Sequence, residues 1–424
     1  MKKVLGLIIL LIWFGCEQTK KTTVDEPVSV LRDSTRTDKI VAFEKKSNEL
    51  LSLALQENKI PRTEENGEIV WATRYNESGE PIFDWTIGFF PGTCWYLYET
   101  TGDEKWKDAA IKFQQGIQPF KSNTESHDLG FVFYCSFGNA FRLTGNDAYK
   151  QVLVEAGNSL LQRFNPKVGC IQSWNVDRGW QSKRDWKFPV IIDNMMNLEL
   201  LFELTALTGD STYREIAISH ADVTLENHFR TDNSSYHVID YNPENGEVRK
   251  RNTAQGYAHE SAWARGQAWG LYGYTVCYRY TKDKKYLDQA HQIANFIINN
   301  PNLPDDGIPY WDYDAPNIPD EPRDVSAAAI TASALIELNG YTDNQFKGFA
   351  HKLIDNLSSD KYLVPLGSKT KFVLNHSVGS IPHGAEIDKP LIYADYYYLE
   401  ALLRSSSEGG SDLLAISPNL SMIK

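Results

Sequence analysis

The sequence has few cysteines and lacks the common motifs of metal and nucleophile chemistry. Its 424 residues include 5 cysteines, and no two of these form a CxxC pair, so neither a disulfide framework nor a zinc site is indicated. The histidines show no HExxH or comparable ligand spacing, and we expect no metal. A GxSxG elbow and a glycine-rich phosphate loop are also missing, which argues against an activated serine or cysteine nucleophile. Three cysteines lie in aromatic, apolar stretches typical of buried free thiols, namely Cys94, Cys135 and Cys277.

Positive charge is also scarce. The formal net charge is -12 at pH 7, which argues against a nucleic-acid partner, because such a partner requires a basic surface. An anionic substrate would need a pocket that is locally positive or rich in neutral donors. Aromatic residues are abundant instead, at 12% of the chain with 11 Trp and 22 Tyr. Most of these rings must form the core, yet such a supply also suits stacking on the ring of a carbohydrate.

The start of the chain has the pattern of a targeting segment. Two lysines give a basic beginning, residues 4–14 form an apolar run too short for a membrane span, and a Gly-Cys pair ends at Cys16. This pattern predicts a lipoprotein signal peptide over residues 1–15, with lipid on the Cys16 sulfur; a plain secretory signal is the alternative. Residues 16–38 are polar and charged and predict a flexible tether. We therefore expect an exported protein, held at a bacterial membrane through its lipid anchor alone, in the periplasm or at the cell surface.

A turn motif recurs along the chain and indicates repeated helical hairpins. In each copy an apolar or aromatic helix end is followed by Thr-Gly-Asp, or a close variant, and then by an aromatic residue. Glycine suits a left-handed helix C-cap, and Asp or Asn suits the N-cap of the next helix. The copies are centred on Thr101-Gly102-Asp103, Thr144-Gly145-Asn146, Thr208-Gly209-Asp210 and Thr281-Lys282-Asp283, with a weaker copy from Leu335 through Asp343 to Phe346.

The stretches between these turns are longer and carry Gly, Asn, Asp and Pro. A helical hairpin cannot bury its own apolar face alone, so about five or six of them should close into a ring. We therefore predict an all-α fold, an (α/α)6 barrel of six hairpins, as one domain over residues 39–424. The long-loop side should hold the functional site, with short β-hairpins such as one around residues 236–240.

Two aspartates are candidates for acid–base chemistry. Asp128 and Asp193 each lie in an apolar stretch at an expected helix start. Loss of water raises the pKa of a carboxyl group, which lets it donate a proton near neutral pH, and two such groups suit acid and base roles. The alternative is that each is a helix N-cap, and Asp84 is open to the same alternative. Asp193 interrupts an apolar run, which favours a functional role for it.

Several tryptophans could provide stacking platforms for a sugar: Trp85, Trp174, Trp263 and Trp269. Trp263 and Trp269 are six residues apart, so they cannot share one helix face, and one of them should belong to the core or a loop. Arg265 and Trp269 are four residues apart and would share a face. Arg265 offers a forked donor for a carboxylate, although a structural ion pair is equally compatible with its spacing.

Four stretches in order along the chain resemble the unsaturated glucuronyl hydrolases, glycoside hydrolase family 88. The resemblance extends from about Asp84 to Arg404, and it is specific because all four stretches occur together. They are His127-Asp128-Leu129-Gly130-Phe131, residues 192–198 (IDNMMNL), residues 263–270 (WARGQAWG) and residues 394–402 (ADYYYLEAL).

The resemblance implies an (α/α)6 barrel that acts on oligosaccharides left by polysaccharide lyases. Such fragments carry a 4,5-unsaturated glucuronic acid at the non-reducing end. Family members hydrate its double bond, a proton going to C4 and water to C5, and the hemiketal that results rearranges so that the glycosidic bond is lost. By resemblance, Asp193 is the general acid and base, and Asp128 is the second essential aspartate, which holds sugar hydroxyls. Neither a cofactor nor a metal is implied.

The resemblance also implies a set of substrate-binding residues. Ser377 and Ser380 fall where members that accept sulfated glycosaminoglycan fragments carry Ser-x-x-Ser-x-Lys, but Pro382 occupies the lysine position. This replacement favours fragments of another acidic polysaccharide, such as ulvan, over glycosaminoglycans. The expected substrate-binding residues are Trp85, His127, Trp174, His237, Gln255, Arg265, Trp269, Ser377 and Ser380.

Two other functions are compatible with the same residues. One is ordinary inverting hydrolysis of saturated glycosides by the barrel, and the other is a non-catalytic, glycan-binding lipoprotein. The pair of embedded carboxyl groups argues against the second, because a site for an anionic sugar gains nothing from buried acids.

Overall fold

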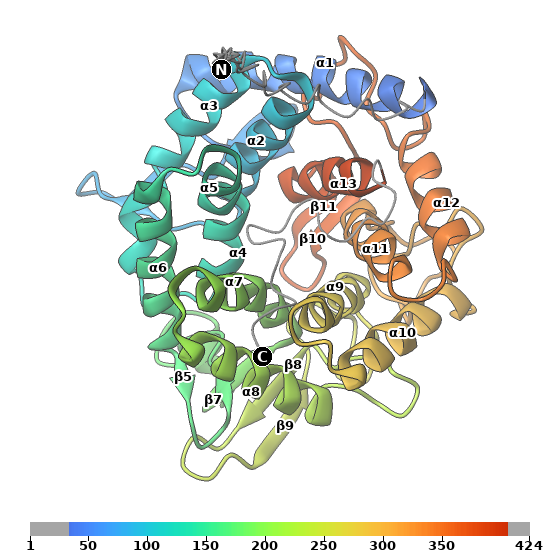
Figure 1. The fold of residues 1–424 in the computed structure, drawn as a ribbon. Coiled ribbons are helices and arrows are strands. Elements are labelled where there is room, and N and C mark those ends of the chain that lie inside the picture. The colour runs from blue at the N-terminus through green and yellow to red at the C-terminus, as the bar shows by residue number, and fades with distance from the viewer. Residues whose placement is uncertain (1–33, 406–424) are drawn as a thin grey trace, which may run out of the picture.

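The computed structural model describes residues 34–405, which form two concentric rings of helices (Figure 1). The inner helices are α2 (Phe89–Thr101), α4 (Leu129–Phe133) with its continuations η2 (Tyr134–Gly138) and α5 (Asn139–Thr144), α7 (Leu198–Thr208), α9 (Ala264–Thr281), α11 (Val325–Asn339) and α13 (Ile392–Arg404). The outer helices are α1 (Ser34–Glu57), α3 (Glu104–Gln115), α6 (Asp147–Leu161), α8 (Ser211–Asn227), α10 (Lys284–Asn299) and α12 (Lys347–Leu357).

The inner ring is closed. Contacts run from α2 through the α4–α5 segment, α7, α9, α11 and α13 and back to α2. Each inner helix is paired with an outer one, and the sixth pair joins the two ends of the described chain, with α13 inside and α1 outside. The predicted (α/α)6 barrel is therefore confirmed.

The repeated turns have the geometry that the sequence predicts. After three of the inner helices a glycine adopts the left-handed conformation, and Lys282 adopts it after α9, with φ of 55°. The residue that follows caps the outer helix, because its side chain accepts a hydrogen bond from the backbone N–H two residues later. These N-caps are Asp103, Asn146, Asp210 and Asp283.

The weaker fifth copy of the turn has a different structure. Helix α11 ends at Asn339, and Asp343 lies within the loop that follows, in a left-handed conformation with φ of 49°. Helix α12 begins after Phe346, whose backbone N–H donates to the side chain of Asn339 at 2.8 Å. The predicted N-cap at Asp343 is therefore wrong, because the side chain of Asn339, at the end of α11, accepts the hydrogen bond at the start of α12 instead.

The chain becomes helical earlier than the predicted tether allows. Helix α1 begins at Ser34, so residues 34–38 belong to a helix and not to the tether. The helix packs against α13, where the ring centroids of Phe43 and Tyr398 are 6.0 Å apart, and this packing gives it a partner that a free tether would lack. The predicted signal peptide and Cys16 lie outside the described residues. No helix between residues 34 and 405 has the length and apolar character needed to cross a membrane.

Short antiparallel sheets occupy the long loops. The strand expected around residues 236–240 is β8 (Val238–Tyr241), the middle strand of a sheet with β7 (Phe188–Ile191) and β9 (Val248–Asn252). In Figure 1, the pair β10 (Ser377–Ser380) and β11 (Ala385–Lys389) projects toward the centre of the ring. The other pairs are β1 (Pro61–Glu65) with β2 (Glu68–Trp71), β3 (Arg74–Tyr75) with β4 (Pro81–Ile82) and β5 (Phe164–Asn165) with β6 (Cys170–Ile171).

A buried ion-pair network connects four inner helices. Arg279 of α9 binds Glu199 of α7 and Glu337 of α11, and Arg404 of α13 lies 3.0 Å from Glu337 and 3.4 Å from Glu400. All five side chains are buried. Loss of one partner would leave a buried charge uncompensated, so the network opposes displacement of these helices. The three cysteines predicted to be buried free thiols, Cys94, Cys135 and Cys277, are buried and free, and so is Cys170.

A short 3-10 helix, η4 (Ile192–Asn197), is held closely between two inner helices. Gly130 of α4 faces Asn197, and a methyl group added to Gly130 would lie 2.4 Å from the Asn197 Cα. Gly273 of α9 faces Met195, and a methyl group there would lie 2.4 Å from the Met195 Cβ. Because neither glycine places a side chain between the backbones, η4 packs directly on α4 and α9.

The substitution Gly130→Ala should lower the free energy of unfolding by about 1–3 kcal/mol, because the added methyl group must push η4 away from α4. Gly348→Ala in α12 is the matched control, since its methyl group would have no atom within 4 Å and alanine favours the helix. Urea unfolding measures both changes. An unchanged free energy of unfolding for Gly130→Ala would contradict the close packing of η4.

Candidate active site

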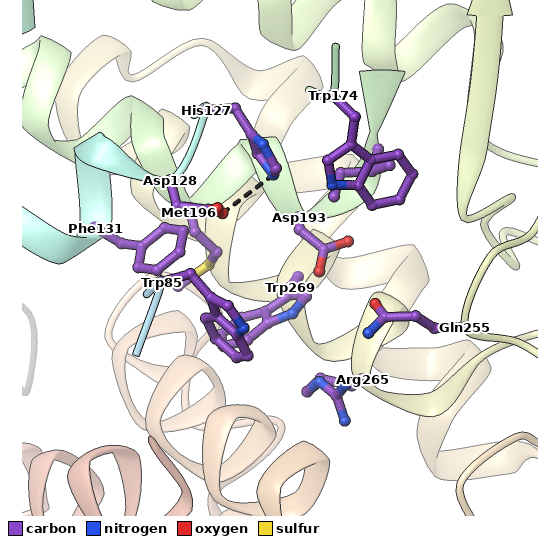
Figure 2. A pocket seen from close by; sticks show the side chains of 11 residues that line it. Trp85, His127, Asp128, Phe131, Trp174, Asp193, Met196, Gln255, Arg265 and Trp269 are labelled. Carbon is purple, nitrogen blue, oxygen red and sulfur yellow. Dashed lines mark ion pairs between the residues drawn. The ribbon is translucent and has the colours of Figure 1, made fainter. Parts of the chain in front are cut away.

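A cavity of about 550 Å³, a volume that includes open solvent at its mouth, lies among the predicted site residues (Figure 2). Side chains from α4, η4, α9 and the long loops meet there. Most of the predicted site residues line it, whereas His237, Ser377 and Ser380 do not. The lining residues are Trp85, His127, Asp128, Phe131, Trp174, Ile191, Asp193, Met196, Gln255, Arg265 and Trp269.

Asp193 lies in the first turn of η4, and 17% of its side chain is exposed. Its Oδ2 atom is buried and accepts no hydrogen bond from the described residues. Burial raises the pKa of Asp193 to about 7, while the positive charge of Arg265 acts in the opposite direction. A carboxyl group with this pKa is partly protonated at neutral pH, so it can both donate and accept a proton.

His237 lies behind Asp193 and not on the cavity wall. Its Nδ1 accepts hydrogen bonds from the backbone N–H groups of Ala254 at 3.0 Å and Gln255 at 3.1 Å. Burial lowers the pKa of His237 well below its usual value, so the ring is neutral and carries its proton on Nε2. That nitrogen lies 3.6 Å from Asp193 Oδ2. The neutral ring therefore brings no charge that would lower the pKa of the acid.

Asp128 occupies the N-cap position of α4, yet its side chain accepts no capping hydrogen bond. Instead, its Oδ2 accepts a hydrogen bond from the Ser126 hydroxyl at 3.0 Å, and its Oδ1 lies 3.1 Å from His127 Nε2. Burial raises the pKa of Asp128 to about 7, against the opposing effects of Ser126 and of the Arg163 charge. The alternative role as a helix cap therefore does not hold for Asp128.

Asp84 has the structural role that the sequence left open for it. Its Oδ1 accepts hydrogen bonds from the backbone N–H of Thr86 at 2.9 Å and from the hydroxyl of Thr86 at 2.7 Å. Its Oδ2 binds Arg62 at 2.7 Å and Arg74 at 3.0 Å. Both oxygens are engaged, so Asp84 stabilises the loop before α2 and is not placed for proton transfer.

Arg265 and Trp269 lie one turn apart on α9, as their spacing predicted, and both line the cavity. Arg265 also forms an ion pair, the alternative role that its spacing left open, because its Nη1 donates to Asp324 at 2.9 Å. Its Nη2 donates to a backbone carbonyl of β10 at 2.6 Å. Trp263 precedes the helix, and its ring centroid lies 4.5 Å from the Arg265 guanidinium and 4.6 Å from the His237 ring. The positive charge at the cavity is therefore held in a fixed position.

The two predicted serines lie beside the cavity. Ser377 is buried at the start of β10, and Ser380, at its end, forms a hydrogen bond of 2.8 Å with His383 Nδ1. Arg265 donates to the carbonyl groups of the two residues between the serines. Strand β10 is therefore joined to the site through Arg265, although neither serine forms part of the cavity wall.

Three lining residues were not among the predicted site residues: Phe131, Ile191 and Met196. Phe131 and Met196 each follow a site aspartate by three residues, and this helical spacing is a signal that could have identified them. Asp324 was missed as well. It lies 59 residues from Arg265 in the chain, and no local pattern connects the two.

The arrangement is suited to acid–base chemistry on a bound sugar. Two carboxyl groups with raised pKa values face a cavity whose other walls are largely aromatic and apolar. Arg265 contributes a positive charge, and Trp269 contributes an aromatic ring that can stack on a sugar. Between residues 34 and 405, no three His, Cys, Asp or Glu side chains are grouped so that they could hold a metal ion.

Comparisons with known proteins identify relatives of this chain. Residues 63–398 match the sequence model of Glycosyl Hydrolase Family 88. An unsaturated glucuronyl hydrolase of Formosa agariphila is 47% identical over 329 residues, which cover 77% of this chain and 81% of that protein. An unsaturated chondroitin disaccharide hydrolase of Streptococcus agalactiae is 34% identical over 334 residues, which cover 76% of this chain and 81% of that protein.

A solved structure shows the same architecture. The crystal structure of an unsaturated glucuronyl hydrolase specific for heparin superposes with a TM-score of 0.78 and 44% sequence identity, covering 88% of this chain and 97% of that chain. The resemblance found in the sequence is confirmed, and the non-catalytic alternative is set aside. This chain belongs to glycosyl hydrolase family 88 and is a glycosidase.

Proposed function

We propose that the enzyme removes the 4,5-unsaturated glucuronic acid from lyase-generated oligosaccharides by hydrating its C4=C5 double bond. The observation that carries this proposal is the pair of cavity carboxyl groups, Asp128 and Asp193, whose pKa values burial raises to about 7. Protonation of a carbon atom requires a neutral acid in a pocket with little water. The names of unsaturated glucuronyl hydrolases among its relatives support the same type of substrate.

The reaction begins when protonated Asp193 donates its proton to C4. Positive charge develops at C5 and is shared with the ring oxygen, and water adds at C5 while ionised Asp193 accepts a proton from it. The product is a hemiketal whose ring opens to a ketone at C5, and this leaves a hemiacetal at C1. The hemiacetal collapses to an aldehyde and releases the remaining sugar as an alcohol, so one water is consumed and Asp193 is regenerated.

Other cavity residues are suited to holding the sugar. Asp128, which Ser126 and His127 keep in place, can accept hydrogen bonds from ring hydroxyls. Arg265, held by Asp324, offers a fixed positive charge for the uronate carboxylate. Trp269 can stack on the sugar ring from the same helix face.

The parent polysaccharide is a finer proposal. The related enzymes include one specific for heparin and one that acts on unsaturated chondroitin disaccharides, which supports glycosaminoglycan fragments as substrates. Pro382, in place of the lysine of the glycosaminoglycan pattern, supports another acidic polysaccharide. We favour ulvan fragments on this ground, with glycosaminoglycan fragments as the second candidate.

The place of action is also a proposal, supported by the sequence alone. The basic start, the short apolar run and Cys16 have the pattern of a bacterial lipoprotein. The enzyme would then act outside the cytoplasm, tethered to a membrane by lipid, where it can receive fragments from extracellular lyases.

The test of the reaction uses the near-ultraviolet absorbance of the double bond. The unsubstituted enzyme should remove this absorbance from lyase-treated ulvan or glycosaminoglycan, and Asp193→Asn should reduce the rate by about 10²–10⁴-fold because the acid is lost. Asp108→Asn, on the exposed face of α3, is the control and should act normally. Retained activity in Asp193→Asn would exclude Asp193 as the acid. Turnover of saturated glycosides without loss of this absorbance would favour ordinary inverting hydrolysis.

The rate should fall as pH rises through about 7, because the first step requires protonated Asp193 and its pKa lies about there. Asp128 titrates in the same range, so the alkaline limb of kcat/KM reports both carboxyl groups together. Measuring kcat/KM from pH 5 to pH 9 tests this expectation. A value of kcat/KM that still rises above pH 8 would show that the ionised form is the one that starts the reaction.

A further inference from the structure

An arginine without an acidic partner lies near the cavity. Arg184 directly follows the short helix η3 (Gln181–Lys183), in the long loop between β6 and β7, and is half-buried. It forms no ion pair with any residue between 34 and 405, although the chain has a net charge of -12. The adjacent carboxylate, Asp185, is already bound to Lys250 at 2.7 Å. The donors of the Arg184 guanidinium are therefore available to a ligand.

A wall of tryptophan rings connects Arg184 with the cavity. Trp174 lines the cavity and stacks on Trp186, with ring centroids 5.7 Å apart, and Trp180 packs 5.0 Å from Trp174 and 5.8 Å from Trp186. The Arg184 guanidinium lies 5.5 Å from the ring centroids of both Trp180 and Trp186. These cation–π contacts position the guanidinium without using its N–H groups.

Two further polar residues lie at the same wall. The His383 ring is 5.0 Å from the Trp180 ring, and its Nδ1 shares a hydrogen bond of 2.8 Å with the Ser380 hydroxyl. When Ser380 donates in this bond, the neutral His383 ring carries its proton on Nε2 and offers a second donor beside Arg184. Burial first, and then the charge of Arg184, lower the pKa of His383, which favours this neutral form.

The position of Arg184 relates it to the catalytic centre. Its charge is among those that lower the pKa of His237, the ring that faces Asp193. The Trp174 ring joins the two places, since it contacts Trp180 and Trp186 on one side and lies 5.9 Å from the His237 ring on the other. A substrate with its uronate at Asp193 could therefore extend its next sugar along the tryptophan wall.

We propose that Arg184, together with His383, binds a sulfate ester on the sugar that follows the unsaturated uronate. A sulfate ester stays negatively charged near neutral pH, and its oxygens match the forked donors of a guanidinium. Arg265 is assigned to the uronate carboxylate and is held at that place by Asp324 and by the carbonyl groups of β10, so a sulfate on the next sugar requires a second cation. The inference rests on the proposed function, and it makes Arg184 a specificity-determining residue where Pro382 provides no charge.

The experiment compares two unsaturated disaccharides that differ only by one sulfate ester on the second sugar. Arg184→Gln should raise KM for the sulfated disaccharide by about ten-fold and leave kcat nearly unchanged, because the sulfate contact is the same in the ground and transition states. KM for the unsulfated disaccharide should stay the same. For the sulfated disaccharide, the KM of Arg184→Lys should lie between those of the unsubstituted enzyme and Arg184→Gln, because lysine keeps the positive charge but lacks the forked donors of a guanidinium.

Arg214→Gln is the matched control. Arg214 is also half-buried and, among the described residues, forms no ion pair, but it lies on the outer helix α8. Its substitution should leave both KM values unchanged, and thermal unfolding should confirm that all variants are folded. An equal rise of KM for both disaccharides in Arg184→Gln would overturn the proposal, and so would an unchanged KM for the sulfated one.

Calorimetric binding separates this proposal from the proposed reaction. If the unsubstituted enzyme turns over neither disaccharide, the proposed function fails, but binding of the two disaccharides can still be measured. Tighter binding of the sulfated disaccharide that is lost in Arg184→Gln would support the sulfate site. Equal affinity of both disaccharides for the unsubstituted enzyme would overturn it.

Discussion

The direct packing of η4 on two inner helices is the constraint on which the active site depends. Asp193 is carried by η4, and Asp128 stands at the start of α4, so the contact between Gly130 and Asn197 fixes how the two aspartates lie relative to each other. On the other side, Gly273 brings α9 against η4, and the same helix carries Arg265 and Trp269. Two backbone contacts thus bring an acid, a second carboxyl group, a positive charge and an aromatic ring to one cavity.

The same packing removes water from the carboxyl groups, and this gives them useful pKa values at a cost in stability. Burial is the largest cause of the raised pKa of both Asp128 and Asp193. The unfolded chain loses these protons near pH 4 and the folded chain near pH 7, so the folded state loses stability as pH rises between these values. Elsewhere in the barrel, buried charges such as Arg279 and Glu337 are paired. Asp128 and Asp193 lie instead beside the neutral rings of His127 and His237, so no full positive charge pairs with either carboxyl group at short range.

Much of the architecture could be predicted because local chemistry determines it. The left-handed position of Gly209 and the cap at Asp210 follow from residue type at adjacent positions, and repetition of that turn implies a ring. Asp128 and Asp193 were found because each lies in an apolar stretch at an expected helix start. Contacts between distant residues could not be found in this way. The partner of Arg265 at Asp324, the place of His237 behind the acid, and the position of β10 beside the cavity arise only when the ring closes.

The central claim is that Asp193 delivers a proton to C4 of the sugar from one side of the cavity. The most direct measurement is to run the reaction in D₂O and to determine by NMR the configuration at C4 of the first product formed. Delivery by Asp193 predicts one deuterium at C4 in a single configuration, since the acid approaches one face of the ring. A mixture of both configurations, or a released uronate that still carries its C4=C5 double bond without deuterium, would contradict the account.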